Sequence, residues 1–139
     1  MGIGWHVVLE TELPGAALAP MDGRALIHRQ HDLDALAALL GVPPLTQFVS
    51  SDPAAIDRYL REQGLDPEDF PLPEVEWFAA EDGLPTVRGL LAHLKAKPDA
   101  VLDAYRIVQD LRAMEAILGT AAAVGLRFHL QSDMPKLNE

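Results

Sequence analysis

A helical repeat of apolar residues dominates the last third of this 139-residue chain. From about Asp99 to Val124, apolar side chains recur every three or four positions, which places them on one face of an α-helix. They are Ala104, Ile107, Val108, Leu111, Met114, Ile117, Leu118 and Ala121. Gly125 follows as a stop signal. A helix with this much apolar surface must be buried. Either the other helices pack around it, or one side of it contacts a second subunit.

Three further helices are predicted upstream of this one. The first runs from about Asp22 to Leu40 and carries a possible break near His31, where polar residues interrupt its apolar stripe. The second begins with Asp52 as its N-cap and ends at Gln63, before a glycine. The third covers about Asp82 to Lys97, with basic residues in its last turn, where the helix dipole favours cations.

Two short segments near the ends of the chain alternate apolar and polar residues, which is typical of β-strands. They are Trp5–Glu10 and Leu126–Leu130. Neither is stable alone, so we expect them to pair as a two-stranded ribbon on the helices. The predicted fold is therefore α+β and predominantly helical, with about four helices in a single globular domain spanning 1–139. The C-terminus from about residue 131 is expected to fray.

Composition excludes several classes of protein. The chain has no cysteine, so disulfides, thiolate metal sites and cysteine nucleophiles are absent. No segment approaches the roughly 20 apolar residues of a membrane-spanning helix, and the N-terminus lacks the pattern of a signal peptide. We therefore expect a soluble, cytoplasmic protein. The excess of arginine over lysine, with abundant alanine and leucine, is typical of a GC-rich bacterial genome.

The net charge and the lack of known motifs disfavour further classes of function. The net charge of −10 disfavours nucleic acids and anionic membranes as partners, because phosphate backbones are bound by clustered Lys and Arg. The chain contains no glycine-rich phosphate loop and no nucleophile elbow. No cofactor is expected.

The acidic charge is concentrated in one segment, Asp66–Asp82. This segment holds seven of the 21 acidic residues and none of the 11 basic ones. Its three prolines favour an extended chain. Aromatic anchors inside a charged rim are typical of protein interfaces. The residues expected to contact a partner are Phe70, Leu72, Glu68, Asp69, Glu74 and Glu76.

The apolar residues of this segment admit two interpretations. Either they pack on the domain's own helices, or some stay exposed and a basic partner buries them. We favour packing for Trp77 and Phe78, which adjoin the third helix, and leave both options open for Phe70 and Leu72. The leading hypothesis is a non-enzymatic bacterial protein that binds a protein partner through this acidic and aromatic surface, which suits a basic partner. Self-association is an alternative.

A second hypothesis is a small enzyme or ligand-binding domain. If the two terminal strands are neighbours, His6 and His129 share a face of the ribbon with Arg127 beside them. Two imidazoles near charged groups suit general acid–base chemistry. The competing interpretation is that these residues form only the polar, exposed face of a half-buried ribbon.

A third hypothesis is a metal site on His28 and His31. Residues three apart on a helix share a face, and zinc and nickel accept imidazole ligands. The nearby carboxylates of Asp32 and Asp34 point to other faces, so a complete ligand set is lacking. Two histidines on a solvated helix surface explain the same pattern.

Overall fold

The computed structural model describes residues 4–11, 21–50, 53–70 and 75–132. The fold is α+β and predominantly helical, as predicted. The described part contains these elements in order: β1 (Trp5–Leu9), α1 (Arg24–His28), α2 (Gln30–Leu40), the 3₁₀ helix η1 (Leu45–Phe48), α3 (Pro53–Glu62), η2 (Pro67–Asp69), β2 (Phe78–Ala79), α4 (Ala80–Ala96), η3 (Pro98–Ala100), α5 (Ala104–Ala123) and β3 (Arg127–Ser132).

The two terminal strands pair with each other, as expected. β1 and β3 are antiparallel neighbours, with β3 in the centre of a three-stranded sheet of order β1-β3-β2. The pairs on the core face are Trp5 with Ser132, Val7 with Leu130 and Leu9 with Phe128. The third strand, β2, was not predicted, because its two residues lie at the end of the acidic segment and show no alternation.

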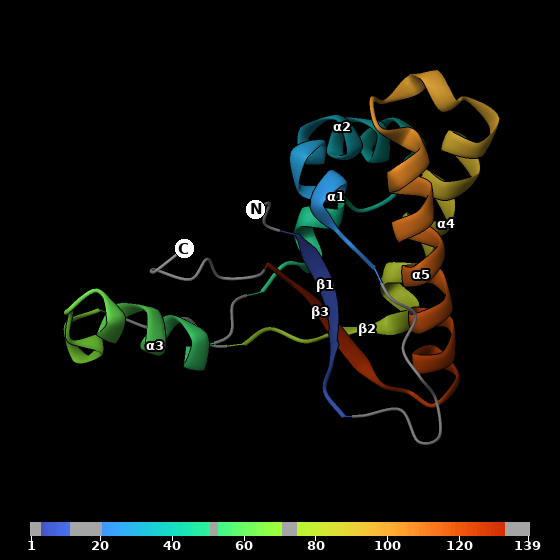
Figure 1. The fold of residues 1–139 in the computed structure, drawn as a ribbon. Coiled ribbons are helices and arrows are strands. Elements are labelled where there is room, and N and C mark those ends of the chain that lie inside the picture. The colour runs from blue at the N-terminus through green and yellow to red at the C-terminus, as the bar shows by residue number, and fades with distance from the viewer. Residues whose placement is uncertain (1–3, 12–20, 51–52, 71–74, 133–139) are drawn as a thin grey trace.

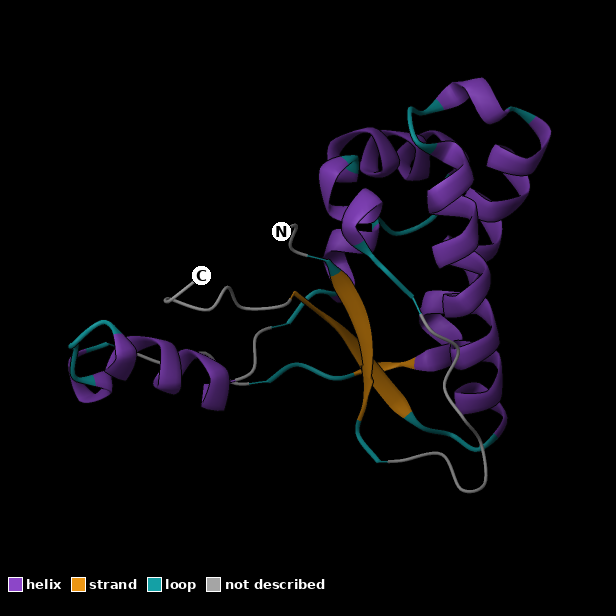
Figure 2. Cartoon of the chain, in the orientation of Figure 1, coloured by secondary structure: helices purple, strands orange, loops and turns teal. Residues whose placement is uncertain are grey.

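Helices α4 and α5 form the body of the molecule together with the sheet (Figure 1). The two helices run side by side along one side of the sheet, and α1 and α2 lie beyond one end of the strands (Figure 2). Leu90 of α4 and Leu111 of α5 are fully buried. Burying one leucine side chain stabilises a fold by roughly 1.5–3 kcal/mol, so this hairpin contributes much of the stability.

An aromatic cluster joins the sheet to the rest of the core. Phe48 of η1 packs edge-on against Phe78 of β2, with ring centroids 5.3 Å apart. Phe128 of β3 lies 5.4 Å from Phe48 and 6.4 Å from Phe78. Such pairs contribute about 0.5–1.5 kcal/mol each beyond the area that they bury. The cluster therefore fixes the end of the acidic segment at the core.

Several predicted boundaries differ from the structure. The first predicted helix is divided into α1 and α2 at Arg29, close to the expected break near His31. The last helix starts at Ala104, because η3 and a turn precede it. β3 extends to Ser132, beyond the residue at which we expected fraying, and the rest of the C-terminus lies outside the described residues.

Helix α3 stands apart from this body. In Figure 1 it lies on the side of the sheet opposite α4 and α5, with a clear separation from the sheet. Its principal neighbour in the described chain is η2, the short helix that follows it. The Asp52 cap predicted for it lies outside the described residues. The segment from α3 to Phe70 therefore projects from the domain.

Candidate functional site

The acidic segment is exposed where its start is described, at Asp66 and at Glu68, Asp69 and Phe70. Asp66 organises it locally, because its side-chain Oδ1 accepts the backbone N–H of Glu68 at 3.0 Å. Glu68 and Asp69 are exposed, and the Phe70 side chain is 42% exposed. An aromatic ring thus lies at the surface directly beside carboxylates. Leu72 and Glu74 fall outside the described residues.

The second half of the segment is docked on the domain. The backbone N–H of Glu76 donates to Ser50 Oγ at 2.9 Å, while the Glu76 side chain is exposed. Trp77 is half-buried, with its ring centroid 4.6 Å from that of His129. Phe78 belongs to the aromatic cluster. The expectation that Trp77 and Phe78 pack on the domain agrees with these contacts.

Leu65 is an exposed apolar residue that sequence reasoning did not single out. It is 44% exposed and lies one residue before Asp66. A signal for it existed, because Gly64 marks the end of α3, and the residue after such a glycine often contacts the helix's last turn. The exposed apolar surface beside the carboxylates therefore includes both Leu65 and Phe70.

The register of the sheet brings the predicted histidines to one face. His6 pairs with Gln131, and Val8 pairs with His129. Paired residues share a face, and residues two apart along a strand do so as well. His6, His129 and Arg127 therefore lie on the same side of the ribbon, away from the core.

The surroundings of these residues do not favour catalysis. His129 is 2% exposed, lies against Trp77, and has its Nε2 3.0 Å from Gln131 Oε1. Its Nδ1 has no hydrogen-bond partner within the described chain. Arg127 is paired with Glu10, with Nη2 2.9 Å from Oε2. This pairing holds the pKa of Glu10 below its ordinary value, chiefly through the side-chain hydrogen bond.

His28 and His31 do not share one continuous helix. His28 ends α1, whereas His31 lies in the first turn of α2, and both side chains are exposed. The argument from helical spacing therefore does not apply to them. Among the described residues, no group of three or more His, Cys, Asp or Glu side chains is arranged to hold a metal ion.

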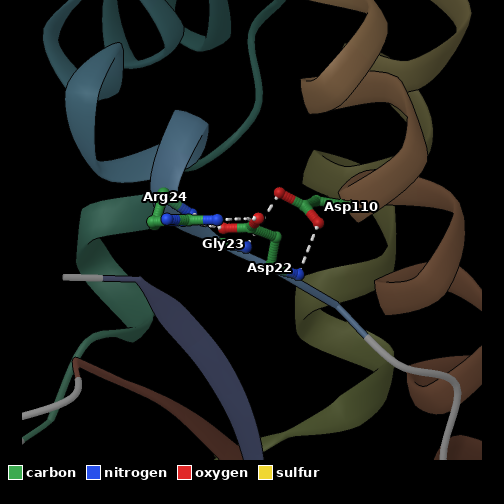
Figure 3. A network of polar contacts seen from close by, with 4 residues as sticks. All are labelled: Asp22, Gly23, Arg24 and Asp110. Carbon is green, nitrogen blue, oxygen red and sulfur yellow. Dashed lines mark hydrogen bonds and ion pairs between the residues drawn. The ribbon is translucent and has the colours of Figure 1, made fainter. Parts of the chain in front are cut away.

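Asp110 forms a polar network that the sequence did not reveal (Figure 3). This carboxylate on α5 is 4% exposed and accepts the backbone N–H groups of Asp22 and Gly23, each at 3.0 Å. The backbone at Gly23 is also bonded to β1, because the Trp5 N–H donates to the Gly23 carbonyl at 3.2 Å. Asp110 thus fixes the chain that leads into α1.

The network shifts the pKa values of the Asp110 and Asp22 carboxyls in opposite directions. Burial raises the pKa of Asp110, although the two N–H groups partly offset this. Hydrogen bonds from Arg24, first from its guanidinium at 2.7 and 2.8 Å, lower the pKa of Asp22 from 3.8 to about 2. Perturbed pKa values cluster at functional sites, but structural ion pairs produce them as well.

A cavity of about 300 Å³ adjoins the network, lined by Asp22, Arg24, Ala25, Arg106, Gln109 and Asp110. Both carboxylate oxygens of Asp110 already accept backbone donors, and the Arg24 guanidinium is bonded to Asp22. The arrangement therefore positions the backbone, and we assign Asp110 a structural role. Its signal in the sequence is a carboxylate directly before Leu111, within the apolar repeat of the last helix.

The chain matches no protein-family model, no curated protein and no solved structure. Within the described residues, none of the helices is both long enough and apolar enough to cross a membrane. A functional interpretation therefore depends on the residues of this chain and on their surroundings.

Proposed function

We propose that this protein binds another protein that presents a basic surface, and that the exposed residues Glu68, Asp69 and Phe70 make the contact. The single observation that carries the proposal is Phe70, a large apolar ring that stays 42% exposed beside Glu68 and Asp69. The docked half of the segment supplies a further exposed carboxylate at Glu76.

The physical reasoning follows the usual anatomy of protein interfaces. An aromatic anchor is buried at the centre of the contact, and charged residues at the rim select the partner. Rim charges chiefly raise the association rate and make binding sensitive to salt. With no basic residue between Asp66 and Asp82, the segment repels nucleic acids and attracts a cationic protein.

The test compares two charge reversals of equal size. The chain is used to capture partners from lysate of its natural host at low salt, and each captured protein is purified for affinity measurement. Glu68→Lys with Asp69→Lys alters the exposed segment. Asp32→Lys with Asp99→Lys is the matched control, because both residues are exposed on the body.

We expect the segment variant to weaken binding of the purified partner about tenfold or more, with a slower association rate. The control variant should stay within about threefold of the unmodified chain. Affinity of the unmodified chain should also fall as salt rises. Equal effects of the two variants, or no captured protein above background, would contradict the proposal.

A further inference from the structure

Residues 53–70, which we call the α3 arm, hold their shape through local contacts. α3 has proline at its first position, where the missing N–H costs nothing. At its other end Gly64 is left-handed, with φ 76°. The Leu65 N–H donates to the Leu60 carbonyl at 2.8 Å, and the Gly64 N–H to the Arg61 carbonyl at 3.0 Å. This pair of bonds is a Schellman motif.

Further local bonds stiffen the arm. Arg61 is bonded to Asp57 one turn earlier, with Nε 2.9 Å from Oδ2. Asp66 then caps η2, as described above, and its carbonyl accepts the Asp69 N–H at 3.0 Å. A segment that is ordered before binding loses less conformational entropy when it binds. The arm therefore has the character of a preformed recognition element.

The apolar side chains of this arm are only partly covered by the described parts of the chain. Leu65 and Phe70 are 44% and 42% exposed, and Tyr59 and Leu60 are half-buried. Besides such local bonds, most helices in proteins are stabilised by packing of their apolar face. The described residues of the body provide little of that packing, because α3 projects from them (Figure 1) and its principal neighbour is η2.

The charge beside this apolar side indicates what covers it. Between Asp57 and Phe70 the chain carries five acidic residues and two basic ones. One of the acids, Asp57, is already paired with Arg61. The exposed carboxylates concentrate at the end of the arm, at Asp66, Glu68 and Asp69. A complementary surface would be apolar along the helix and basic near its C-terminal end.

We propose that the α3 arm docks as a helix into an apolar groove of the partner protein, with Lys or Arg at the end of the groove that receives η2. Leu60, Leu65 and Phe70 are the anchors. This inference rests on the proposed function and extends its site to a helix. Of these anchors only Leu60 lies on α3, whereas Leu65 follows its C-terminal glycine and Phe70 follows η2. The groove therefore receives the last turn of the helix together with the cap and the 3₁₀ turn beyond it. A second copy of this chain is a poorer occupant, because the net charge of −10 makes two copies repel.

The test uses the full chain and the purified partner captured by it. Leu65→Ser with Phe70→Ser removes two anchors, and Leu39→Ser with Leu102→Ser is the control, since these body residues are 79% and 69% exposed. Arg58→Pro breaks the helix at an exposed position, with Arg58→Ala as its control. Urea unfolding of each variant checks that the body stays folded.

We expect the anchor variant to weaken binding about 30-fold or more and Arg58→Pro about tenfold, with each control within about threefold. If Arg58→Pro binds normally while the anchor variant and Glu68→Lys with Asp69→Lys both weaken binding, the helix is not the recognition element, although the proposed function stands. If the anchor variant binds normally, both proposals fail. If nothing is captured, both fail. Sedimentation of the chain alone detects self-association, and a dimer lost in the anchor variant would make a second copy the occupant and overturn the inference.

Discussion

The body and the α3 arm are built from similar helical patterns but differ in what covers them. α5 buries its apolar stripe, and Ile107, Leu111 and Leu118 have no exposed surface. α3 has the same kind of stripe and a well-formed C-terminal cap, yet Leu65 and Phe70 beside it remain open to solvent. An amphipathic pattern thus predicts that a helix forms, whereas long-range contacts decide what covers it.

The difference extends to the polar contacts. In the body, polar contacts join residues that are far apart in the sequence. Asp110, for example, accepts backbone N–H groups 87 and 88 residues away. Those of the arm span two to five residues, as in the pairing of Arg61 with Asp57. Contacts that join distant segments make unfolding of the body cooperative. We therefore expect substitutions in the body to change global stability and equivalent substitutions in the arm to change it little.

The largest expected effect comes from a glycine in the body. Gly23 has φ +74°, and a Cβ there would meet the Trp5 carbonyl oxygen at 1.8 Å, closer than atoms can approach. Gly23→Ala should therefore displace the segment held by Asp110 and reduce the free energy of unfolding by about 4 kcal/mol or more. Urea denaturation monitored by circular dichroism measures this loss.

Gly64 in the arm is the matched control. It has almost the same backbone angle, φ +76°, but a Cβ there meets nothing within 4 Å. Gly64→Ala should cost only the left-handed conformation, about 1–2 kcal/mol, and this cost falls on the arm rather than on the global transition. Equal losses in the two variants would show that the arm unfolds together with the body.

The next effect concerns the core of α5. Leu111 is fully buried, so Leu111→Ala should lower the free energy of unfolding by about 2–5 kcal/mol. Leu65→Ala in the arm makes the same chemical change at a side chain that is 44% exposed, and should cost under about 0.5 kcal/mol. If Leu111→Ala costs well under 1 kcal/mol, we have misassigned the buried face of this helix.

The same division explains how much the sequence predicts. The stripe containing Leu111 and the alternation around Phe128 predict the last helix and the ribbon, because both patterns are local. Strand β2 could not be predicted, since Phe78 and Ala79 become a strand only by pairing with β3. The extent of α5 was overestimated for a similar reason: the turn before Ala104 is fixed by contacts rather than by composition.

The residues of the candidate site likewise divide into those that local sequence patterns predict and those that depend on distant contacts. The exposed carboxylates Glu68 and Asp69 and the docking of Trp77 could be foreseen from charge and from adjacency to a helix. The Asp110 network could not, because its donors are backbone groups distant in the sequence. For His28 and His31, one turn at Arg29 separates the two helices and removes the spacing on which the metal hypothesis depended.

The smallest expected effect is a change in acid titration at the Asp22–Arg24 pair. The pKa of Asp22 is about 2 in the folded chain, below the ordinary 3.8. The stability that this group contributes is therefore present above pH 3.8 and lost as the pH falls through about 2. In Arg24→Ala the largest cause of the shift, the side-chain hydrogen bond, is gone. The pKa of Asp22 should then rise toward 3.8, measured by carboxyl NMR titration.

The contribution of Asp110, in the same network, to the pH dependence of stability has the opposite sign. Because burial raises its pKa above 3.8, the folded chain binds this proton more tightly than the unfolded chain, and the stability that Asp110 contributes is lost as the pH rises through its folded pKa.

Arg61→Ala removes the ion pair of the arm and should leave the titration of Asp22 unchanged. If Arg61→Ala moved the Asp22 midpoint as far as Arg24→Ala does, the arm and the body would be electrostatically coupled, and their separation would have to be abandoned.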